Sequence, residues 1–148
     1  MEHVPSSAVV TPLASVNIRA AGYVIDVVPA VLMAVAVGWI PIFGAMIAGV
    51  LLGTYWLFKD VAGASLGKLI LGTRVTRSDG TRAGIARRLA RNVPLAFGPS
   101  LLLIPFIGYG LGPFASFLLF VTEIFVLAFT GQRIGDRLAG TTVMPMAR

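Results

Sequence analysis

The sequence predicts an all-α membrane protein with four transmembrane helices arranged as two hairpins. Of its 148 residues, 57% are hydrophobic and only 12% are charged, and the mean hydropathy is +0.89. An ordinary soluble domain has about a quarter charged residues, so this chain has too little charge to cover a water-facing surface. The apolar residues also gather in four segments separated by turns or by one polar stretch.

The first hairpin is predicted from residues 20–38 and 42–58. A bilayer core of about 30 Å requires roughly 20 mostly apolar residues in a helix. The first segment carries one charge, Asp26, and the second carries none. Only the turn at residues 38–41 separates them, so the two helices are expected to run antiparallel.

The second hairpin is predicted from residues 93–107 and 114–130, with the glycine-rich stretch 108–113 as its turn. The third segment is short, and the Gly98-Pro99 pair is expected to kink it. A three-span arrangement, with residues 93–113 re-entrant, is the alternative.

The distribution of charge predicts the orientation. The loop at residues 59–91 contains eight basic residues and two acidic ones, whereas the turns at 38–41 and 108–113 contain no charge. Lysine and arginine remain on the cytoplasmic side of a membrane. The loop, the N-terminal tail (1–18) and the C-terminal tail (144–148) are therefore expected in the cytoplasm.

The loop has local order of its own. Residues 65–71 predict a short interfacial helix ended by Gly72, residues 73–77 alternate as a strand does, and residues 85–91 read as a basic amphipathic helix. A basic helix of this kind can bind anionic lipid headgroups. Anchoring of the topology by positive charge is the simpler interpretation of the loop.

Several classes of function are not expected. The chain has no cysteine, and its single histidine is His3 in the polar tail. This composition excludes disulfides and cysteine nucleophiles and argues against a zinc site. No constellation of nucleophile, base and metal ligands is visible, so neither an enzyme nor a cofactor is predicted. The basic residues of the loop have no interleaved aromatic residues, which argues against nucleic-acid binding.

Two acids inside the apolar segments are the candidate ion or proton-binding residues. Asp26 lies seven residues after Arg19, two turns deeper on the same helix face. Glu123 lies eight residues before Gly131, at a similar depth. Buried ionisable groups in a membrane are costly and need a partner or a function. The two carboxylates could share one site if the first and fourth segments pack together.

The alternative role for Asp26 is structural. An arginine, namely Arg19, Arg91 or Arg133, would hold it permanently and lock the bundle. Asp136 stands between Arg133 and Arg137 and is expected to join a cytoplasmic ion-pair network.

Small residues recur every four positions in the second segment, at Ala45, Gly49 and Gly53. Such a stripe lets helices approach closely. Packing within the chain is the favoured interpretation, and a homodimer interface is the alternative.

The motifs together resemble the RDD family of bacterial membrane proteins, named for an arginine and two aspartates. Arg19 and Asp26 match its first motif, residues 67–75 with 79–80 and 91–92 resemble its central segment, and residues 131–143 resemble its ending, which supplies Asp136. The resemblance covers residues 19–143. One departure is Gly135, where many relatives have histidine.

The resemblance implies a multi-pass protein of the bacterial inner membrane, and transport or accessory roles have been suggested for relatives. Two functions are therefore carried forward. The first is exchange of monovalent cations for protons through Asp26 and Glu123, with Arg19 and Asp136 orienting the site. The second is a non-transporting accessory subunit that binds a membrane protein or lipid partner through the basic loop.

Overall fold

The computed structural model describes residues 14–40 and 43–146. Residues 1–13 of the predicted N-terminal tail, residues 147–148 of the C-terminal tail, and Pro41 and Ile42 of the first turn lie outside the described residues. The elements in chain order are α1 (Val16–Gly38), α2 (Gly44–Phe58), α3 (Leu66–Ile70), β1 (Thr73–Arg77), α4 (Ile85–Ala90), α5 (Val93–Ser100), the 3-10 helix η1 (Leu101–Leu103), α6 (Ile107–Thr130), α7 (Ile134–Ala139) and β2 (Thr141–Pro145).

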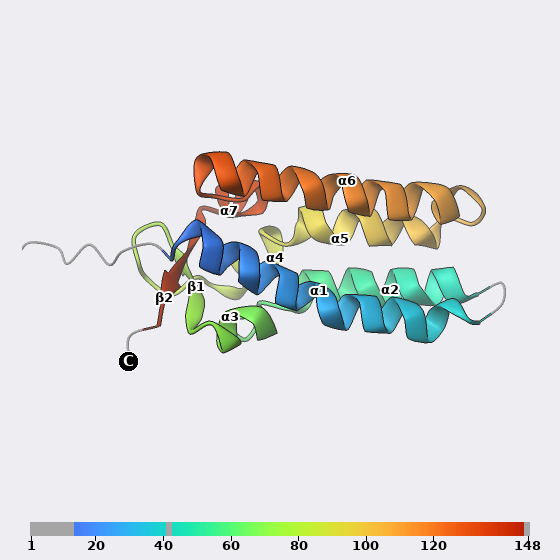
Figure 1. Cartoon of the computed structure of the whole chain (residues 1–148), viewed down its shortest axis with the longest axis horizontal. Coiled ribbons are helices and arrows are strands. Elements are labelled where there is room, and N and C mark those ends of the chain that lie inside the picture. Colours follow the sequence, from blue (N-terminus) through green and yellow to red (C-terminus); the bar gives the residue numbers. More distant parts are fainter. Residues whose placement is uncertain (1–13, 41–42, 147–148) are drawn as a thin grey trace, which may run out of the picture.

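The helices α1, α2, α5 and α6 run lengthwise and form the body of the molecule (Figure 1). α1 and α2 form one antiparallel hairpin, and α5 and α6 form the other. α2 packs against α5 and joins the two hairpins, whereas α1 and α6 make few contacts with each other. The buried core lies among Tyr23, Ala30, Trp56, Leu95 and Ala96.

Two of these helices have the length and composition to cross a membrane. They are α1 and α6, with mean hydropathies of 2.1 and 2.0 over their apolar windows. α2 and the combined α5–η1 segment are apolar but shorter. α1 begins earlier than predicted because the Ser15 hydroxyl accepts a hydrogen bond from the Ile18 N–H and caps the helix.

The outer faces of the two long helices are apolar. The side chains that point outward and are more than half exposed include Val24, Val28, Leu32 and Val35 on α1, and Phe114, Phe117, Phe125 and Phe129 on α6. An exposed apolar surface of this extent is unfavourable in water and suits contact with lipid.

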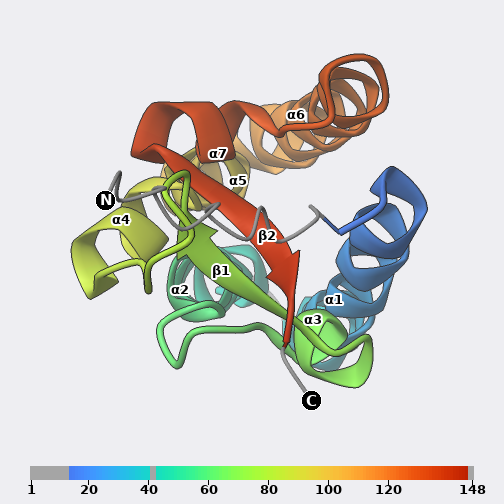
Figure 2. The same cartoon turned by 90° about the vertical axis from the view of Figure 1, so that its left-hand side faces the viewer.

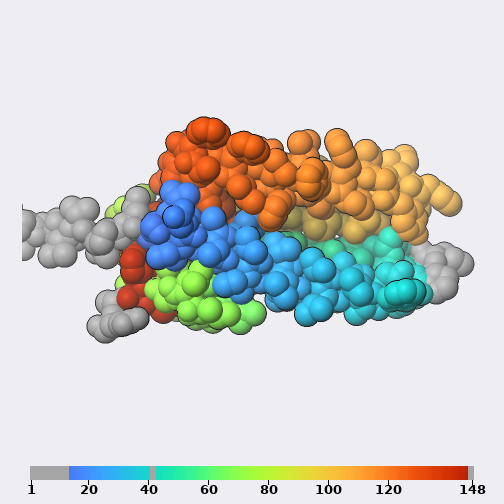
Figure 3. Space-filling view, viewed as in Figure 1, coloured from blue at the N-terminus to red at the C-terminus, as the bar shows by residue number. Residues whose placement is uncertain are grey.

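The side between α1 and α6 is hollowed (Figure 3). The hollow has a volume of about 250 Å³, with Val27 on one wall, Phe117 on the other and Leu95 and Pro99 of α5 as its floor. The bundle is therefore open on this side.

Short elements cover the end of the bundle where α1 begins. β1 and β2 form an antiparallel pair in which Val75 lies opposite Val143, and Figure 2 shows the pair lying across the bundle end. The prediction of a strand at 73–77 is confirmed, and so are short helices near 65–71 and 85–91. The sequence did not predict β2, so the described fold is mostly helical rather than all-α.

The predicted turn at residues 108–113 is wrong. The turn lies earlier, at Ile104–Phe106, where Phe106 has a φ of 63°. The following glycines are helical, and two of them, Gly108 and Gly112, serve close packing. A Cβ atom at Gly112 would lie 2.8 Å from the Leu102 side chain, so glycine allows α6 to approach η1 there.

The small-residue stripe of α2 is used within the chain. A Cβ atom at Gly49 would lie 2.9 Å from Leu102 Cβ, and one at Gly53 would lie 3.1 Å from Ser100 Oγ. These glycines let α2 pack directly against α5 and η1, as the favoured interpretation predicted.

Candidate functional site

The buried charges gather at the end of the bundle covered by α3, α4, α7 and the two strands. The buried cationic side chains there are Arg19, Lys59, Lys68, Arg88, Arg91 and Arg133, and the buried carboxylates are Asp26, Asp60, Glu123 and Asp136. We call these ten side chains the polar network. Its members come from α1, the loop after α2, α6 and the chain after α6.

Asp26 is held by donors from the loop after α2. Its Oδ2 accepts hydrogen bonds from Lys59 Nζ at 2.9 Å and Ser65 Oγ at 2.6 Å. Its Oδ1 accepts one from the Gly67 N–H at 2.7 Å, and Lys68 Nζ lies 4.0 Å from Oδ2. With 1% of its surface exposed, this carboxylate is held from several directions at once.

A glycine allows α3 to come close enough to α1 to bind Asp26. α3 lies so close to α1 that a Cβ atom at Gly67 would overlap the Gly22 carbonyl group. The absence of a side chain at Gly67 lets its N–H reach the Asp26 carboxylate. The Gly67-Lys68 pair therefore serves carboxylate binding in this chain.

Lys59 sits among aromatic rings as well as beside Asp26. Its Nζ lies 4.3 Å from the centroid of the Trp56 ring and 5.1 Å from that of Tyr23. A cation over an aromatic face is stabilised when it is desolvated. The buried ammonium group is thus stabilised by one carboxylate and two aromatic rings.

Asp60 links two basic residues of the loop, Lys68 and Arg91. Its Oδ1 accepts a hydrogen bond from Lys68 Nζ at 2.7 Å, and its Oδ2 accepts one from Asn92 Nδ2 at 3.2 Å. Arg91 Nε lies 3.7 Å from the same Oδ2 atom. Asp60 therefore ties α3 to the start of α5.

Asp136 gathers arginines from three parts of the chain. Arg19 Nη2 lies 2.6 Å from its Oδ2 and Arg91 Nη2 lies 2.7 Å from its Oδ1, while Arg133 Nε is 3.8 Å away. Arg19 also donates to the Gly131 carbonyl group at the end of α6. The expected network around Asp136 exists, although Arg137 is exposed and outside it.

Gly135 sets the position of Asp136. A Cβ atom at Gly135 would overlap the carbonyl group of Arg91. With this backbone, glycine brings α7 against the start of α5 and places Asp136 within reach of Arg91.

Glu123 is the least engaged acid. Its Oε1 accepts one hydrogen bond, from the Gly135 N–H at 3.3 Å, and its Oε2 has no hydrogen-bond partner among the described residues. Glu123 and Asp26 bind different groups and share neither a hydrogen bond nor an ion pair in the described chain. The structure therefore does not bring them into one site.

The ion pairs shift the protonation of groups in the loop and after α6. Burial on its own raises the pKa of Asp60, but Lys68, Arg91 and Lys59 outweigh it and hold that pKa well below its usual value. Burial also opposes ionisation of Asp136, and Arg91, Arg133 and Arg19 lower its pKa overall. For Lys59, burial and the charge of Lys68 lower the pKa to about 7.

The predicted partner of Asp26 is wrong. An arginine was expected, but the partner is Lys59, because the end of α2 faces α1 whereas Arg19 turns toward α7. Sequence reasoning also missed Asp60 and Ser65 as members of the site. The signal available was the Lys59-Asp60 pair directly after an apolar segment, which was counted only as loop charge.

Half of the loop's basic residues are internal. Lys59, Lys68, Arg88 and Arg91 have buried side chains, and Arg88 donates to the carbonyl groups of Val61 and Ala83, each at 2.7 Å. The exposed arginines at this end are Arg74, Arg77, Arg82, Arg87 and Arg137. The loop's surface charge is therefore smaller than its composition indicated.

Within residues 14–40 and 43–146, no three histidine, cysteine, aspartate or glutamate side chains are grouped so that they could hold a metal ion. The carboxylates of the polar network are paired with lysine and arginine. This arrangement offers a cation few free oxygen atoms.

Comparison with known proteins tests the resemblance. The family model for the RDD family matches residues 12–140. No curated protein and no solved structure matches the chain. The match spans most of the chain, including Arg19, Asp26 and Asp136, and the two long apolar helices agree with a membrane protein. This small membrane protein belongs to the RDD family.

Proposed function

We propose that the protein is an accessory subunit of the bacterial inner membrane, with four spans and both termini in the cytoplasm, which binds a partner at its arginine-bearing end. The observation that carries this proposal is the set of hydrogen bonds that the Asp26 carboxylate accepts. Lys59, Ser65 and Gly67 all donate to its carboxylate. A carboxylate held in this way acts as a fixed joint between α1 and the loop.

The charge around Asp26 also favours a structural role over cation exchange. The polar network contains six cationic side chains and four carboxylates. A metal cation entering next to Asp26 would have to displace Lys59 and approach Lys68. Like charges at short range in a buried site are strongly unfavourable.

The proposed orientation rests on the same end of the molecule. α1 begins, α2 ends, α5 begins and α6 ends there, and the exposed arginines lie there too. Basic residues favour the cytoplasmic side. Four spans require α2 and the α5–η1 segment to cross along with α1 and α6, and local thinning of the bilayer accommodates short helices at modest cost.

A surface hollow at this end supports partner binding. It has a volume of about 260 Å³ and is lined by Arg74, Arg82, Thr76 and Leu69 among others. We call it the docking hollow. Two exposed arginines beside apolar atoms suit an acidic segment of a neighbouring membrane protein, because guanidinium groups bind carboxylates in a forked geometry.

The test uses a fluorescent oligoglutamate peptide and the purified protein in uncharged detergent. Wild type should bind the peptide, and the double variant Arg74→Glu/Arg82→Glu should weaken binding at least tenfold. Arg137→Glu is the matched control, since Arg137 is exposed but outside the docking hollow. Equal losses of affinity in both variants, or no loss in either, would refute the proposal that the partner binds in the docking hollow. Binding only to vesicles with anionic lipid would assign this surface to the membrane.

One observation favours the second candidate, exchange of monovalent cations for protons. Lys59 pairs with Asp26, and its pKa of about 7 means that it can release a proton near neutral pH. Loss of that proton would free Asp26 to bind a cation.

Proteoliposomes with an internal pH-sensitive dye distinguish the two functions. Pulses of Na⁺, K⁺ or Li⁺ are applied to wild type and to Asp26→Asn. The accessory proposal expects no proton movement in either and a lower melting temperature for the variant. Cation-dependent proton movement in wild type that disappears in Asp26→Asn would establish exchange instead.

A further inference from the structure

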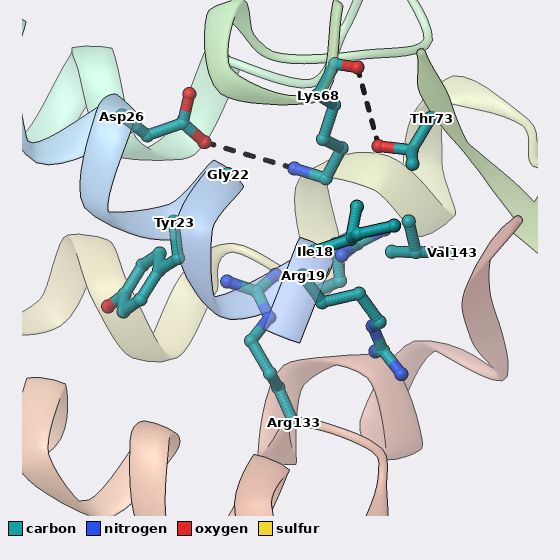
Figure 4. Close-up of a pocket in the computed structure, with 10 residues that line it drawn as sticks. Ile18, Arg19, Gly22, Tyr23, Asp26, Lys68, Thr73, Arg133 and Val143 are labelled. Carbon is teal, nitrogen blue, oxygen red and sulfur yellow. Dashed lines mark hydrogen bonds and ion pairs between the residues drawn. The ribbon is translucent and has the colours of Figure 1, made fainter. Parts of the chain in front are cut away.

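A small cavity lies inside the polar network. Its volume is about 20 Å³, which is enough for one water-sized particle. Figure 4 shows Asp26 and Lys68 on one side of it and Arg19 and Arg133 on the other, and Arg91 also contributes to its wall. Four cationic side chains and one carboxylate thus surround a space for a single small particle.

Two of the residues that line this cavity, Arg91 and Arg133, have buried donors without a hydrogen-bond partner in the described chain. These donors are Arg91 Nη1 and Arg133 Nη2. Arg91 itself has 0% of its surface exposed and Arg133 has 5%. Buried donors left unpaired cost free energy, and charged donors cost the most. The carboxylate of Asp26 cannot relieve them, since it is already held by Lys59, Ser65 and Gly67.

The net positive charge of the polar network also favours an anion in this cavity. The polar network has more cationic side chains than carboxylates, and excess buried charge of one sign is unfavourable. A water molecule would accept from two donors, but the charged acceptor on the wall for its own hydrogens is the Asp26 carboxylate, which already accepts three hydrogen bonds. A spherical anion accepts from every direction and also reduces the excess positive charge.

We propose that the cavity among Arg19, Lys68, Arg91 and Arg133 binds one small monovalent anion, which is chloride in the cell. The anion completes the polar network between α1, the loop and the chain after α6. This inference does not depend on the docking hollow, because every residue it uses is internal. The cavity excludes phosphate groups and carboxylates of lipids by its size.

The first measurement is crystallographic. Crystals of the wild-type protein are grown in bromide, and the anomalous signal of bromine is measured. A peak in the cavity next to Arg91 and Arg133 is expected. Density there without an anomalous signal would mean that water occupies the cavity and would overturn the proposal.

The second measurement is thermal melting in chloride and in gluconate at equal ionic strength. Chloride should raise the melting temperature of wild type by a few degrees, because an anion that binds only the folded state stabilises it. Arg133→Gln should lose this difference, and Arg137→Gln, at an exposed position on α7, should keep it. Equal melting of wild type in the two salts would contradict an anion site, whatever the variants do.

Discussion

At the end of the bundle where α1 begins, the helices are joined by buried ions, whereas in the half that holds η1 they are joined by glycine and leucine. Asp26, Asp60 and Asp136 connect segments far apart in the sequence through hydrogen bonds to Lys59, Asn92 and Arg19. Gly49 and Gly112 instead let helix backbones approach Leu102. Ion pairs therefore position specific side chains at one end, whereas close packing at the other end holds the helices together.

Loss of a central ion should have the largest effect. Arg91→Ala removes the partner of Asp136 and a neighbour of Asp60, both fully buried. Breaking a buried pair costs about 3–5 kcal/mol. We expect a large fall in the melting temperature in detergent. Arg74→Ala is the control, since Arg74 is exposed. If both variants melt alike, the polar network does not hold this end together.

The close packing of α2 against η1 should be destabilised by an added side chain. Gly49→Ala places a methyl group 2.9 Å from Leu102 Cβ, and overpacking costs about 1–3 kcal/mol. Gly110→Ala is the matched helical control, because no atom lies within 4 Å of its Cβ position. The control should be neutral or stabilising. Destabilisation by Gly110→Ala of the same size would show that the close contact at Gly49 is not the cause.

The pH dependence should reveal Lys59. Its pKa falls from an unfolded value of about 10.4 to about 7 in the folded protein. Between these values the unfolded chain binds more protons, so stability rises with pH. Lys68, whose pKa burial also lowers, contributes with the same sign. We expect a gain of about 1–2 kcal/mol from pH 7 to pH 9, since one pKa unit is about 1.4 kcal/mol.

Lys59→Met tests the origin of that rise. The variant should show a shallower increase in melting temperature between pH 7 and pH 9 than wild type. An unchanged slope would assign the rise to other groups.

The smallest effect is expected at Glu123. Glu123→Gln keeps an oxygen for the Gly135 N–H, and Oε2 has no hydrogen-bond partner to lose among the described residues. The change in stability should be below about 1 kcal/mol, because one weak hydrogen bond is retained. Thermal melting checks this. A loss of stability as large as that of Asp26→Asn would mean that Glu123 holds the polar network together as Asp26 does.

Local patterns made much of the fold predictable. The long apolar segments predicted α1 and α6. In the loop, the alternating residue pattern at 73–77 predicted β1, and the amphipathic pattern at 85–91 predicted α4. These elements depend on neighbours in sequence. β2 was not foreseen, because Thr141–Pro145 becomes a strand by pairing with Thr73–Arg77, a partner distant in the chain.

The site was predictable in its members more than in its connections. The motif spacing singled out Arg19, Asp26 and Asp136 as charged residues that need partners. Which cation meets which carboxylate depends on how α2 and α7 pack against α1, and sequence spacing does not encode that. Lys59 therefore took the place that an arginine was expected to hold.

Lys59 holds the Asp26 carboxylate in place. A double-mutant cycle tests this at pH 6, where Lys59 is charged, using Asp26→Leu, Lys59→Met and the double variant in one detergent. Each single variant should melt well below wild type, and the double variant should recover much of the loss. The coupling should be about 2 kcal/mol or more, near the upper range for groups in contact. Additive losses would show that Lys59 does not hold Asp26 and would contradict the structural role of this ion pair.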